Sequence, residues 1–243
     1  MDLKNKVAVV TGGSRGIGKA TVAGLAEQGC RVVFCGKNKH NLEKSGKDFR
    51  KSGLDVVGFL CDLSKPKEVK KFADFVSREF GKIDILVNSA GIAYYKNLTD
   101  TKDEEINNII DVNIKGLILL TKHLLPKINK GGLIINISSG AGKRGYGGLA
   151  VYCASKFAVI GFTESLAQEL KDIKVLAVCP GGVDTDMYYG MFKEHAKLKP
   201  EHIAAKILEI YTEEKVKSGS AIEVYRVSDL VKHVRLKYFR KSN

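Results

Sequence analysis

The sequence predicts an α/β fold in which a doubly wound parallel sheet of about seven strands has helices on both faces. Short β-branched runs alternate with longer amphipathic stretches along the whole chain, and this alternation is typical of repeated βαβ units. The chain has 243 residues, of which 44% are hydrophobic, enough for one sizeable core. No linker, repeat or low-complexity segment divides it, so we expect a single domain over residues 1–243.

Each expected strand is a short apolar run, and each expected helix is a longer stretch with apolar residues at helical spacing. The helices at Pro66 and Pro200 begin with proline, whose missing N–H costs nothing at that position. The expected strands are residues 6–10, 31–35, 55–60, 83–87, 133–137, 174–178 and 221–224. The expected helices include residues 16–28, 66–80, 152–170 and 200–214. Because these elements use up the chain, loops at the carboxyl ends of the strands must build any site.

Composition narrows the class of protein. The net charge is +13, but the lysines are spread along the chain and are not interleaved with aromatic residues, which argues against a nucleic-acid binder. No apolar run approaches the ~20 residues of a membrane span, and the first residues do not form a signal peptide. The five cysteines form no Cys-x-x-Cys pair, so we expect buried free thiols and a cytoplasmic protein. The scattered histidines predict no metal site.

A glycine-rich loop follows the first expected strand and precedes a helix. It reads TGGSRGIG over residues 11–18. Glycines allow a tight turn and a close approach to a pyrophosphate, and the helix N-terminus favours the anion. A plain tight turn is the alternative. The pattern predicts a dinucleotide site, and its expected contacts in this loop are Gly12, Ser14, Arg15, Gly16, Ile17 and Gly18.

Two later strand ends add expected cofactor contacts. Asp62, with Leu63 beside it, follows the third strand and can accept a hydrogen bond from an adenine amino group. Its alternative role is that of an acid at a helix N-terminus. After the fourth strand, Asn88, Ala90 and Gly91 belong to a run of small residues that can crowd against the cofactor. For Asn88 the alternative is a turn former.

The end of the second strand predicts a preference for NADP(H) over NAD(H). Enzymes specific for NAD usually carry an acid there, which accepts from the ribose 2′-hydroxyl. Here the strand continues through Gly36 into Lys37, with no acid, and Arg15 in the glycine loop is expected on the same side of the ribose. Both bases suit a 2′-phosphate. The alternative is that they are two of forty solvated bases.

Tyr152 and Lys156 lie four residues apart in an expected helix, so they share one face. A phenol titrates near ~10, and a nearby ammonium lowers that value. Such a tyrosine can donate a proton to a carbonyl oxygen while hydride arrives at carbon. Only this tyrosine has a serine, Ser139, at a strand end thirteen positions upstream. The same four-residue spacing recurs at Tyr189/Lys193 and Tyr211/Lys215. We interpret these two pairs as structural.

Five motifs follow one another along the chain: TGxxxGxG at residues 11–18, NSAG at 88–91, NISS at 136–139, YCASK at 152–156 and PGGVDT at 180–185. In this order they resemble the motifs of the single-domain short-chain dehydrogenase/reductases, and similar members include 3-oxoacyl-(acyl-carrier-protein) reductases. The resemblance covers nearly all of the chain. It implies a Rossmann-type fold and hydride transfer between a nicotinamide cofactor and a carbonyl or secondary alcohol.

The resemblance also implies catalytic roles. Tyr152 is the general acid/base, and Lys156 lowers its pKa and holds the nicotinamide ribose. Ser139 donates to the substrate oxygen, with Ser138 as the alternative at the same strand end. Asn113 positions a water that passes protons to Lys156, unless it is only a satisfied helix residue.

The last motif and the segment after it are expected to hold the nicotinamide and cover the substrate. Pro180 and Gly181 lead to Val183 and Thr185, which the resemblance places against the nicotinamide carboxamide and the phosphate. An expected lid over residues 184–200 carries Met187, Tyr188, Tyr189, Met191 and Phe192. These side chains suit an apolar or amphipathic substrate, or they fill a small core of the lid itself. The opposite wall, residues 140–149, offers Lys143 and Arg144 to an anionic group.

The end of the chain departs from the family pattern. In place of a Val-Asp-Gly-Gly type sequence it has Val224-Tyr225 and then a basic tail over residues 230–243. This departure puts an acyl-carrier substrate and the common tetramer in doubt. The tail is either solvated or docks on an acidic carrier protein or an anionic surface. Residues 114–125 and 152–170 are apolar on more than one face, which predicts a homodimer or homotetramer.

The substrate stays open at this stage. Acyl thioesters, steroid or sphingoid ketones, polyols and small alcohols all fit the same motifs. A dinucleotide-binding protein without catalysis is the alternative from another class, and the complete set of Asn113, Ser139, Tyr152 and Lys156 argues against it.

Overall fold

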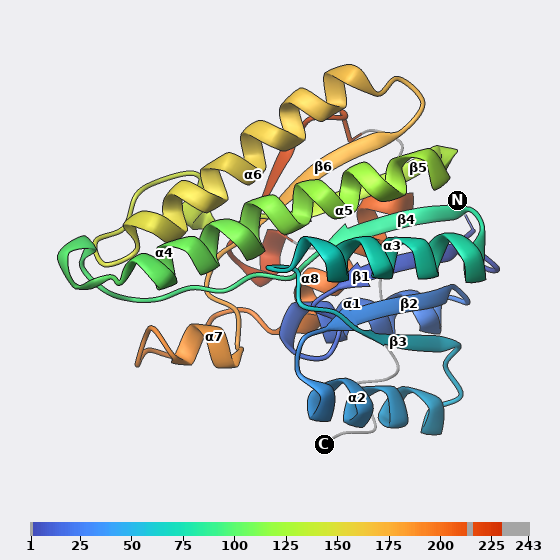
Figure 1. The fold of residues 1–243 in the computed structure, drawn as a ribbon, viewed down its shortest axis with the longest axis horizontal. Helices are drawn as coiled ribbons and strands as arrows, with labels where there is room; N and C mark the ends of the chain where they lie inside the picture. Colours follow the sequence, from blue (N-terminus) through green and yellow to red (C-terminus); the bar gives the residue numbers. More distant parts are fainter. Residues whose placement is uncertain (1, 213–215, 230–243) are drawn as a thin grey trace.

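The computed structural model describes residues 2–212 and 216–229 and contains one seven-stranded, fully parallel sheet (Figure 1). The strands lie in the order β3-β2-β1-β4-β5-β6-β7. Their bounds are β1 Val7–Thr11, β2 Arg31–Gly36, β3 Val56–Leu60, β4 Ile83–Asn88, β5 Ile128–Ile137, β6 Lys174–Pro180 and β7 Ala221–Val224. The chain moves outward from β1 to β3 and then returns to place β4 beside β1. This reversal of direction opens a crevice at the carboxyl ends of β1 and β4, where ligands of such sheets bind.

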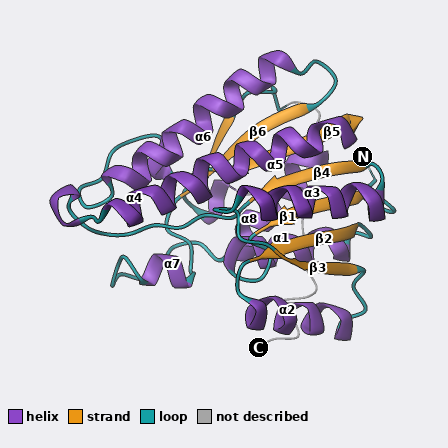
Figure 2. Ribbon diagram, in the orientation of Figure 1, coloured by secondary structure: helices purple, strands orange, loops and turns teal. Residues whose placement is uncertain are grey.

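Helices cover both faces of the sheet (Figure 2). Their bounds are α1 Gly16–Glu27, α2 Lys39–Lys51, α3 Pro66–Phe80, α4 Asp103–Ile110, α5 Leu117–Leu124, α6 Ala150–Glu169, α7 Asp186–Tyr189 and α8 Pro200–Thr212. A π-helical turn, Asp111–Gly116, joins α4 to α5. Short 3₁₀ turns occupy Leu98–Asp100, Leu125–Lys127, Gly140–Gly142 and Val227–Asp229.

Alternation along each strand divides the core into two layers. In β1, Val10 packs with residues of α1, α2 and α8, whereas Val9 packs with residues of α3, α5 and α6. Both layers are apolar, because a parallel sheet covered on both faces needs nearly continuous hydrophobic strands. The doubly wound fold expected from the sequence is confirmed.

The expected elements match the structure closely, with one clear error. The strand 221–224 and the helix 66–80 have the expected bounds. The fifth strand was expected at residues 133–137, but it begins at Ile128. Ile128 is followed by Asn129, Lys130 and two glycines. These residues interrupt the apolar run, so the sequence pattern does not show the first part of the strand. The expected end of the last helix and the basic tail 230–243 lie outside the described residues.

All five cysteines are buried free thiols, as expected. Within residues 2–212 and 216–229, no helix is both long and apolar enough to cross a membrane. The same residues hold no group of three or more His, Cys, Asp or Glu side chains arranged to bind a metal ion.

Candidate active site

The glycine loop packs so closely on its neighbours that side chains would not fit. A Cβ on Gly12 would lie 2.9 Å from Ala90 Cα, and one on Gly18 would lie 2.3 Å from the Gly12 carbonyl oxygen. The Thr11 hydroxyl oxygen accepts hydrogen bonds from the N–H groups of Ser89 and Ala90, each at 3.0 Å. These contacts fix the loop against the end of β4. Among the described residues no side chain caps the N-terminus of α1, so its first turn can bind an anion.

A cavity of about 740 Å³ opens over this loop. It extends from the glycine loop across the ends of β2, β3 and β4 to the start of the lid. The cofactor contacts expected from the sequence that line it are Gly12, Ser14, Arg15, Gly16, Ile17, Gly18, Lys37, Asp62, Leu63, Ala90, Gly91 and Thr185. Its size and these crowded glycines fit a dinucleotide.

The side chain of Asn88 does not line this cavity, so the expected contact between Asn88 and the cofactor stays a prediction. Asn88 is the last residue of β4 and only 1% exposed, and its amide donates to Thr121 Oγ1 at 3.0 Å and Asn136 Oδ1 at 2.8 Å. Because successive strand residues point to opposite sides, the next residue, Ser89, faces the cavity instead. Ser89 belongs to the run of small residues expected at this strand end but was not among the expected contacts, although alternation along the strand could have identified it.

Asp62 combines its two expected roles. It lines the cavity, and its Oδ1 accepts hydrogen bonds from Ser64, from the N–H at 3.0 Å and from the hydroxyl at 2.8 Å. These bonds shape the turn before α3. Oδ2 accepts no hydrogen bond within the described residues and so is open to an amino group.

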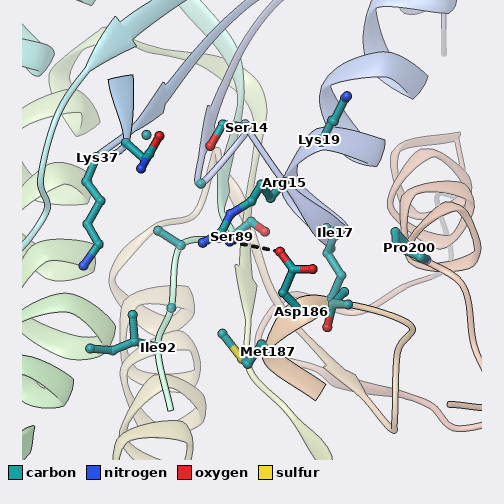
Figure 3. Close-up of a pocket in the computed structure, with 18 of the residues that line it drawn as sticks. Ser14, Arg15, Ile17, Lys19, Lys37, Ser89, Ile92, Asp186, Met187 and Pro200 are labelled. Carbon is teal, nitrogen blue, oxygen red and sulfur yellow. Dashed lines mark hydrogen bonds and ion pairs between the residues drawn. The ribbon is translucent and has the colours of Figure 1, made fainter. Parts of the chain in front are cut away.

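Arg15 and Lys37 both lie at the rim of the cavity, as Figure 3 shows. Arg15 Nη1 lies 2.9 Å from Asp186 Oδ2 at the start of α7, and the two side chains are 62% and 80% exposed. A Cβ on Gly36 would lie 2.8 Å from Ser14 Oγ, so the chain before Lys37 runs directly beside the glycine loop. The structure therefore places both bases next to the position expected for the adenosine ribose.

A second cavity, of about 700 Å³, adjoins the first and holds three of the four expected catalytic residues, Ser139, Tyr152 and Lys156. The two cavities share Ile17, Ser89, Gly91, Thr185 and Met187. The expected site residues in the second cavity are Ser138, Ser139, Tyr152, Lys156, Pro180, Gly181, Val183 and Thr185. A cofactor in the first cavity would therefore reach a substrate in the second.

Tyr152 and Lys156 are both buried in α6, and the Lys156 ammonium donates a hydrogen bond to the backbone. Lys156 Nζ is 5.7 Å from the centre of the Tyr152 ring and donates to the Ile137 carbonyl oxygen at 2.9 Å. Burial raises the pKa of Tyr152 to about 12, and a hydrogen bond with Ser139 offsets part of the rise. Lys156 is not among the causes of this shift, and the expected lowering of the Tyr152 pKa by its ammonium stays a prediction. Burial likewise lowers the pKa of Lys156 to about 8.

The two serines at the end of β5 have different surroundings. Ser138 is 3% exposed, and its hydroxyl donates to the Lys156 carbonyl oxygen at 2.8 Å. Ser139 forms the hydrogen bond with Tyr152, and its oxygen accepts from the Ala141 N–H at 3.1 Å. The geometry favours Ser139 over Ser138 as the group that meets the substrate oxygen.

Asn113 lies behind the two cavities in the π-helical turn. Its Oδ1 accepts from the Ile92 N–H at 2.9 Å, and its amide donates to the Ile92 carbonyl at 2.9 Å and to Ser155 Oγ at 3.0 Å. A Cβ on Gly91 would lie 3.4 Å from both Asn113 Oδ1 and Lys156 Nζ. Asn113 thus ties the loop after β4 to α6, and its amide and the Lys156 ammonium approach the same glycine.

The lid contributes to the substrate cavity and also packs on itself. Met191 and Phe192 pack beside Tyr152 and Leu149, and the Phe192 ring lies 5.2 Å from that of Tyr188. The lid side chains therefore form a small core of their own and also line the cavity, and the apolar or amphipathic substrate stays a prediction. The other two tyrosine–lysine spacings place no tyrosine in the second cavity. Tyr189 ends α7, is 45% exposed and lines the first cavity, whereas Tyr211 is in the α8 core and Lys215 lies outside the described residues.

Comparisons with known proteins agree with this geometry. A family model described as short chain dehydrogenase matches residues 6–196. Carbonyl reductase family member 4 of Danio rerio is 37% identical over 79% of this chain and 81% of that protein. The 3-oxoacyl-(acyl-carrier-protein) reductase of Escherichia coli is 37% identical over 77% of each chain. A short-chain dehydrogenase from Burkholderia cenocepacia, solved in complex with NADP, has a TM-score of 0.85 and 28% identity over 94% of this chain and 100% of its own.

Proposed function

The chain belongs to the short-chain dehydrogenase/reductase family of NAD(P)-dependent oxidoreductases, and we propose that it uses NADP(H) to interconvert a carbonyl and a secondary alcohol. The observation that carries the proposal is the position of Tyr152, Ser139 and Lys156 in a cavity that opens directly onto the dinucleotide cavity. The apolar residues of the lid suit an apolar or amphipathic substrate.

The preference for NADP(H) rests on the bases at the rim of the first cavity. Lys37 follows β2 where an NAD-specific protein carries an acid, and Arg15 reaches the same cavity from the glycine loop. A 2′-phosphate there would meet two positive charges. The NADP bound to the related Burkholderia structure supports the same choice.

The chemistry divides between cofactor and protein. When bound, the nicotinamide supplies or accepts the hydride at the substrate carbon. In reduction Tyr152, whose raised pKa keeps it protonated, donates its phenolic proton to the carbonyl oxygen. One hydride and one proton thus convert the ketone to the alcohol, and oxidation reverses both transfers.

The groups around the phenol make that proton transfer possible. Ser139 donates to the substrate oxygen and stabilises the charge that develops on it. Lys156, with its pKa lowered to about 8 by burial, holds the nicotinamide ribose and returns a proton toward Tyr152. Asn113 fixes the loop of Gly91 against α6, and the wider turn around it can hold the water that supplies Lys156.

The nicotinamide half of the cofactor would lie against the loop after β6. Pro180, Gly181 and Val183 line the second cavity, and Thr185 lines both cavities. We assign Val183 to the carboxamide and Thr185 to the phosphate. In this arrangement Thr185 also caps the first turn of the lid helix, because its Oγ1 accepts from the Tyr188 N–H at 3.3 Å.

Two partner assignments belong to the same proposal. The outer face of α6 leaves Phe157 47% exposed beside exposed Ala154 and Gly161, which supports a homodimer or homotetramer through α5 and α6. The five buried thiols support a cytoplasmic location. An acyl-carrier substrate is a second candidate, favoured by the identity with the Escherichia coli reductase.

A panel of carbonyl substrates tests the proposal. It should include a 3-oxoacyl thioester, a steroid ketone, a small diketone, a medium-chain methyl ketone and a medium-chain oxo acid, each scored by loss of NADPH absorbance. Reduction of at least one substrate by the wild type, and its loss in Tyr152→Phe, is the expected result. If every substrate is inert with both NADPH and NADH, the proposed function is wrong.

A further inference from the structure

One wall of the second cavity is unusually polar. It is formed by residues 143–146, which follow the Ser139 strand end, and by residues 223–225 at the end of β7; we call it the polar wall. Lys143, Arg144, Tyr146, Glu223 and Tyr225 all line the cavity there. The opposite, lid-side wall carries Met187, Met191 and Phe192. A ligand in this cavity therefore meets apolar side chains of the lid as well as the charges of the polar wall.

The polar wall is in contact with the reaction centre. A Cβ on Gly140, the residue after Ser139, would lie 3.2 Å from Tyr225 Cε1. A Cβ on Gly181 would lie 3.2 Å from Tyr225 Cδ1. Tyr225 thus packs on both loops that flank the expected position of the reacting carbonyl. A group held at the polar wall is part of the same substrate, not of a separate site.

The acid of the polar wall is already bound. Glu223 Oε1 lies 3.8 Å from Lys143 Nζ, and the Tyr225 phenol donates to the Glu223 carboxylate. Burial raises the pKa of Tyr225 to about 12, and this hydrogen bond makes the second-largest contribution to the rise. Lys143 and Glu223 therefore largely cancel each other's charge.

Arg144 is the cation that remains. Its Nε donates to the Tyr146 phenol oxygen at 2.6 Å, and the guanidinium carbon lies 4.9 Å from the centre of the Tyr146 ring. No carboxylate pairs with Arg144 within residues 2–212 and 216–229. A guanidinium held through Nε keeps its terminal N–H groups available, and these bind a carboxylate in two parallel hydrogen bonds.

The lid adds a second cation to the same cavity. Lys197 lines it and forms no ion pair with any described residue. Glu194, also on the lid, is the one cavity-lining carboxylate besides Glu223 among the described residues. Two cations without carboxylate partners therefore share the cavity with one unpaired acid, so the balance favours an anionic ligand.

We infer that the carbonyl substrate carries a carboxylate, which Arg144 binds while the apolar body of the substrate packs on the lid. This inference rests on the proposed function and narrows its substrate class to oxo acids and the corresponding hydroxy acids. Tyr146 orients Arg144, and Lys197 contributes long-range attraction from the lid.

Paired substrates test the inference. Methyl ketones with a terminal carboxylate, from six to ten carbons long, are compared with their methyl esters by kcat/KM with NADPH. The wild type should prefer the acids, and Arg144→Gln should lower the acid-to-ester ratio by roughly 10-fold, because one charge-assisted contact at an exposed site is lost. The loss should lie in KM, with kcat within about twofold, since the carboxylate is bound equally before and during hydride transfer.

Matched variants separate this effect from a general loss of charge. Lys130→Gln removes a charge from a side chain that is 90% exposed and paired with Asp172 far from the cavity, and it should leave the ratio unchanged. Equal use of acids and esters by the wild type and Arg144→Gln would overturn the inference while the proposed function stands.

If no ketone is reduced, the proposed function fails. The inferred carboxylate site is then tested by measuring ligand binding. Calorimetric titration with the hydroxy acids and their methyl esters, in the presence of NADP⁺, measures recognition of the carboxylate without turnover. Tighter binding of the acid, lost in Arg144→Gln, supports the assignment. The same affinity for acid and ester refutes it.

Discussion

Arg15 Nη1 lies 2.9 Å from Asp186 Oδ2, although 171 residues separate them in the sequence. The contact joins the glycine loop to the first residue of the lid helix, as the dashed line in Figure 3 marks. The same guanidinium is proposed to bind the 2′-phosphate of NADP(H). The lid carboxylate and the phosphate therefore compete for Arg15, which connects cofactor selection to the position of the lid.

This competition predicts that Asp186→Asn strengthens the binding of NADPH. The two side chains are 62% and 80% exposed, and exposed pairs contribute at most about 1 kcal/mol, so the gain in affinity should not exceed about fivefold. NADH, which has no 2′-phosphate, should bind as before. Fluorescence titration with both cofactors measures this; weaker binding of NADPH by the variant would show that Asp186 supports the phosphate site.

The two rim bases predict the choice of cofactor. The wild type should favour NADPH over NADH, and Arg15→Ala/Lys37→Ala should reduce that preference by roughly 10- to 150-fold, because hydrogen bonds to a charged phosphate are lost. The measurement is kcat/KM with each cofactor on one substrate. Lys70→Ala, on the exposed side of α3, is the matched control. If the double variant keeps the wild-type ratio of kcat/KM values, Arg15 and Lys37 do not bind the 2′-phosphate.

Burial of Lys156 predicts a stability that depends on pH. Its pKa is lowered from 10.5 to about 8, so between those values the unfolded chain holds a proton that the folded protein lacks. The contribution of Lys156 to the free energy of unfolding therefore rises with pH across this window, and below pH 8 the folded protein carries the full cost of a buried ammonium. The raised pKa of Tyr152 affects the free energy of unfolding only above pH 10.

Lys156→Met should accordingly stabilise the protein without cofactor at pH 7, by roughly 1–3 kcal/mol. The difference from wild type should shrink between pH 8 and pH 10. Urea denaturation at both ends of the window checks it, with Lys67→Met, an exposed lysine of α3, as the control. A difference that does not change with pH would mean that the ammonium is not the cause.

The exposed face of α6 predicts self-association. The wild type should be a dimer or larger at micromolar concentration, and Phe157→Glu should shift it toward the monomer, because a charge would replace a large apolar side chain at the contact. Multi-angle light scattering gives the mass directly. A wild-type particle of 26.6 kDa would rule the prediction out.

The sequence predicted the sheet and most of the site because both depend on local patterns. Alternating elements and glycine spacing determined the strands, the loop after β1 and the face shared by Tyr152 and Lys156. The start of β5 at Ile128 was missed because polar and glycine residues occupy its edge. The side-chain partners of Asn88 were not predicted because these residues, Thr121 and Asn136, come from distant parts of the chain.

The pKa of Tyr152 is a second property that the sequence pattern did not predict. Sequence spacing places Lys156 on the same helix face, which suggests a lowered value. The structure shows that Lys156 donates to Ile137 instead, and that burial of the phenol is the larger effect. Burial comes from tertiary packing, so no local pattern could have given its sign. The Arg15–Asp186 contact is likewise tertiary.

The central claim is that Tyr152 transfers the proton in an NADPH-dependent carbonyl reduction. The most direct measurement is single-turnover reduction of the best substrate of the panel by wild type, Tyr152→Phe and Tyr211→Phe, with NADPH affinity titrated for each. We predict a loss of ~10²–10⁴-fold in Tyr152→Phe, with NADPH affinity nearly unchanged, and wild-type rates in Tyr211→Phe. A rate in Tyr152→Phe within a factor of about two of wild type would contradict the account, since proton-transfer catalysis is worth far more than that.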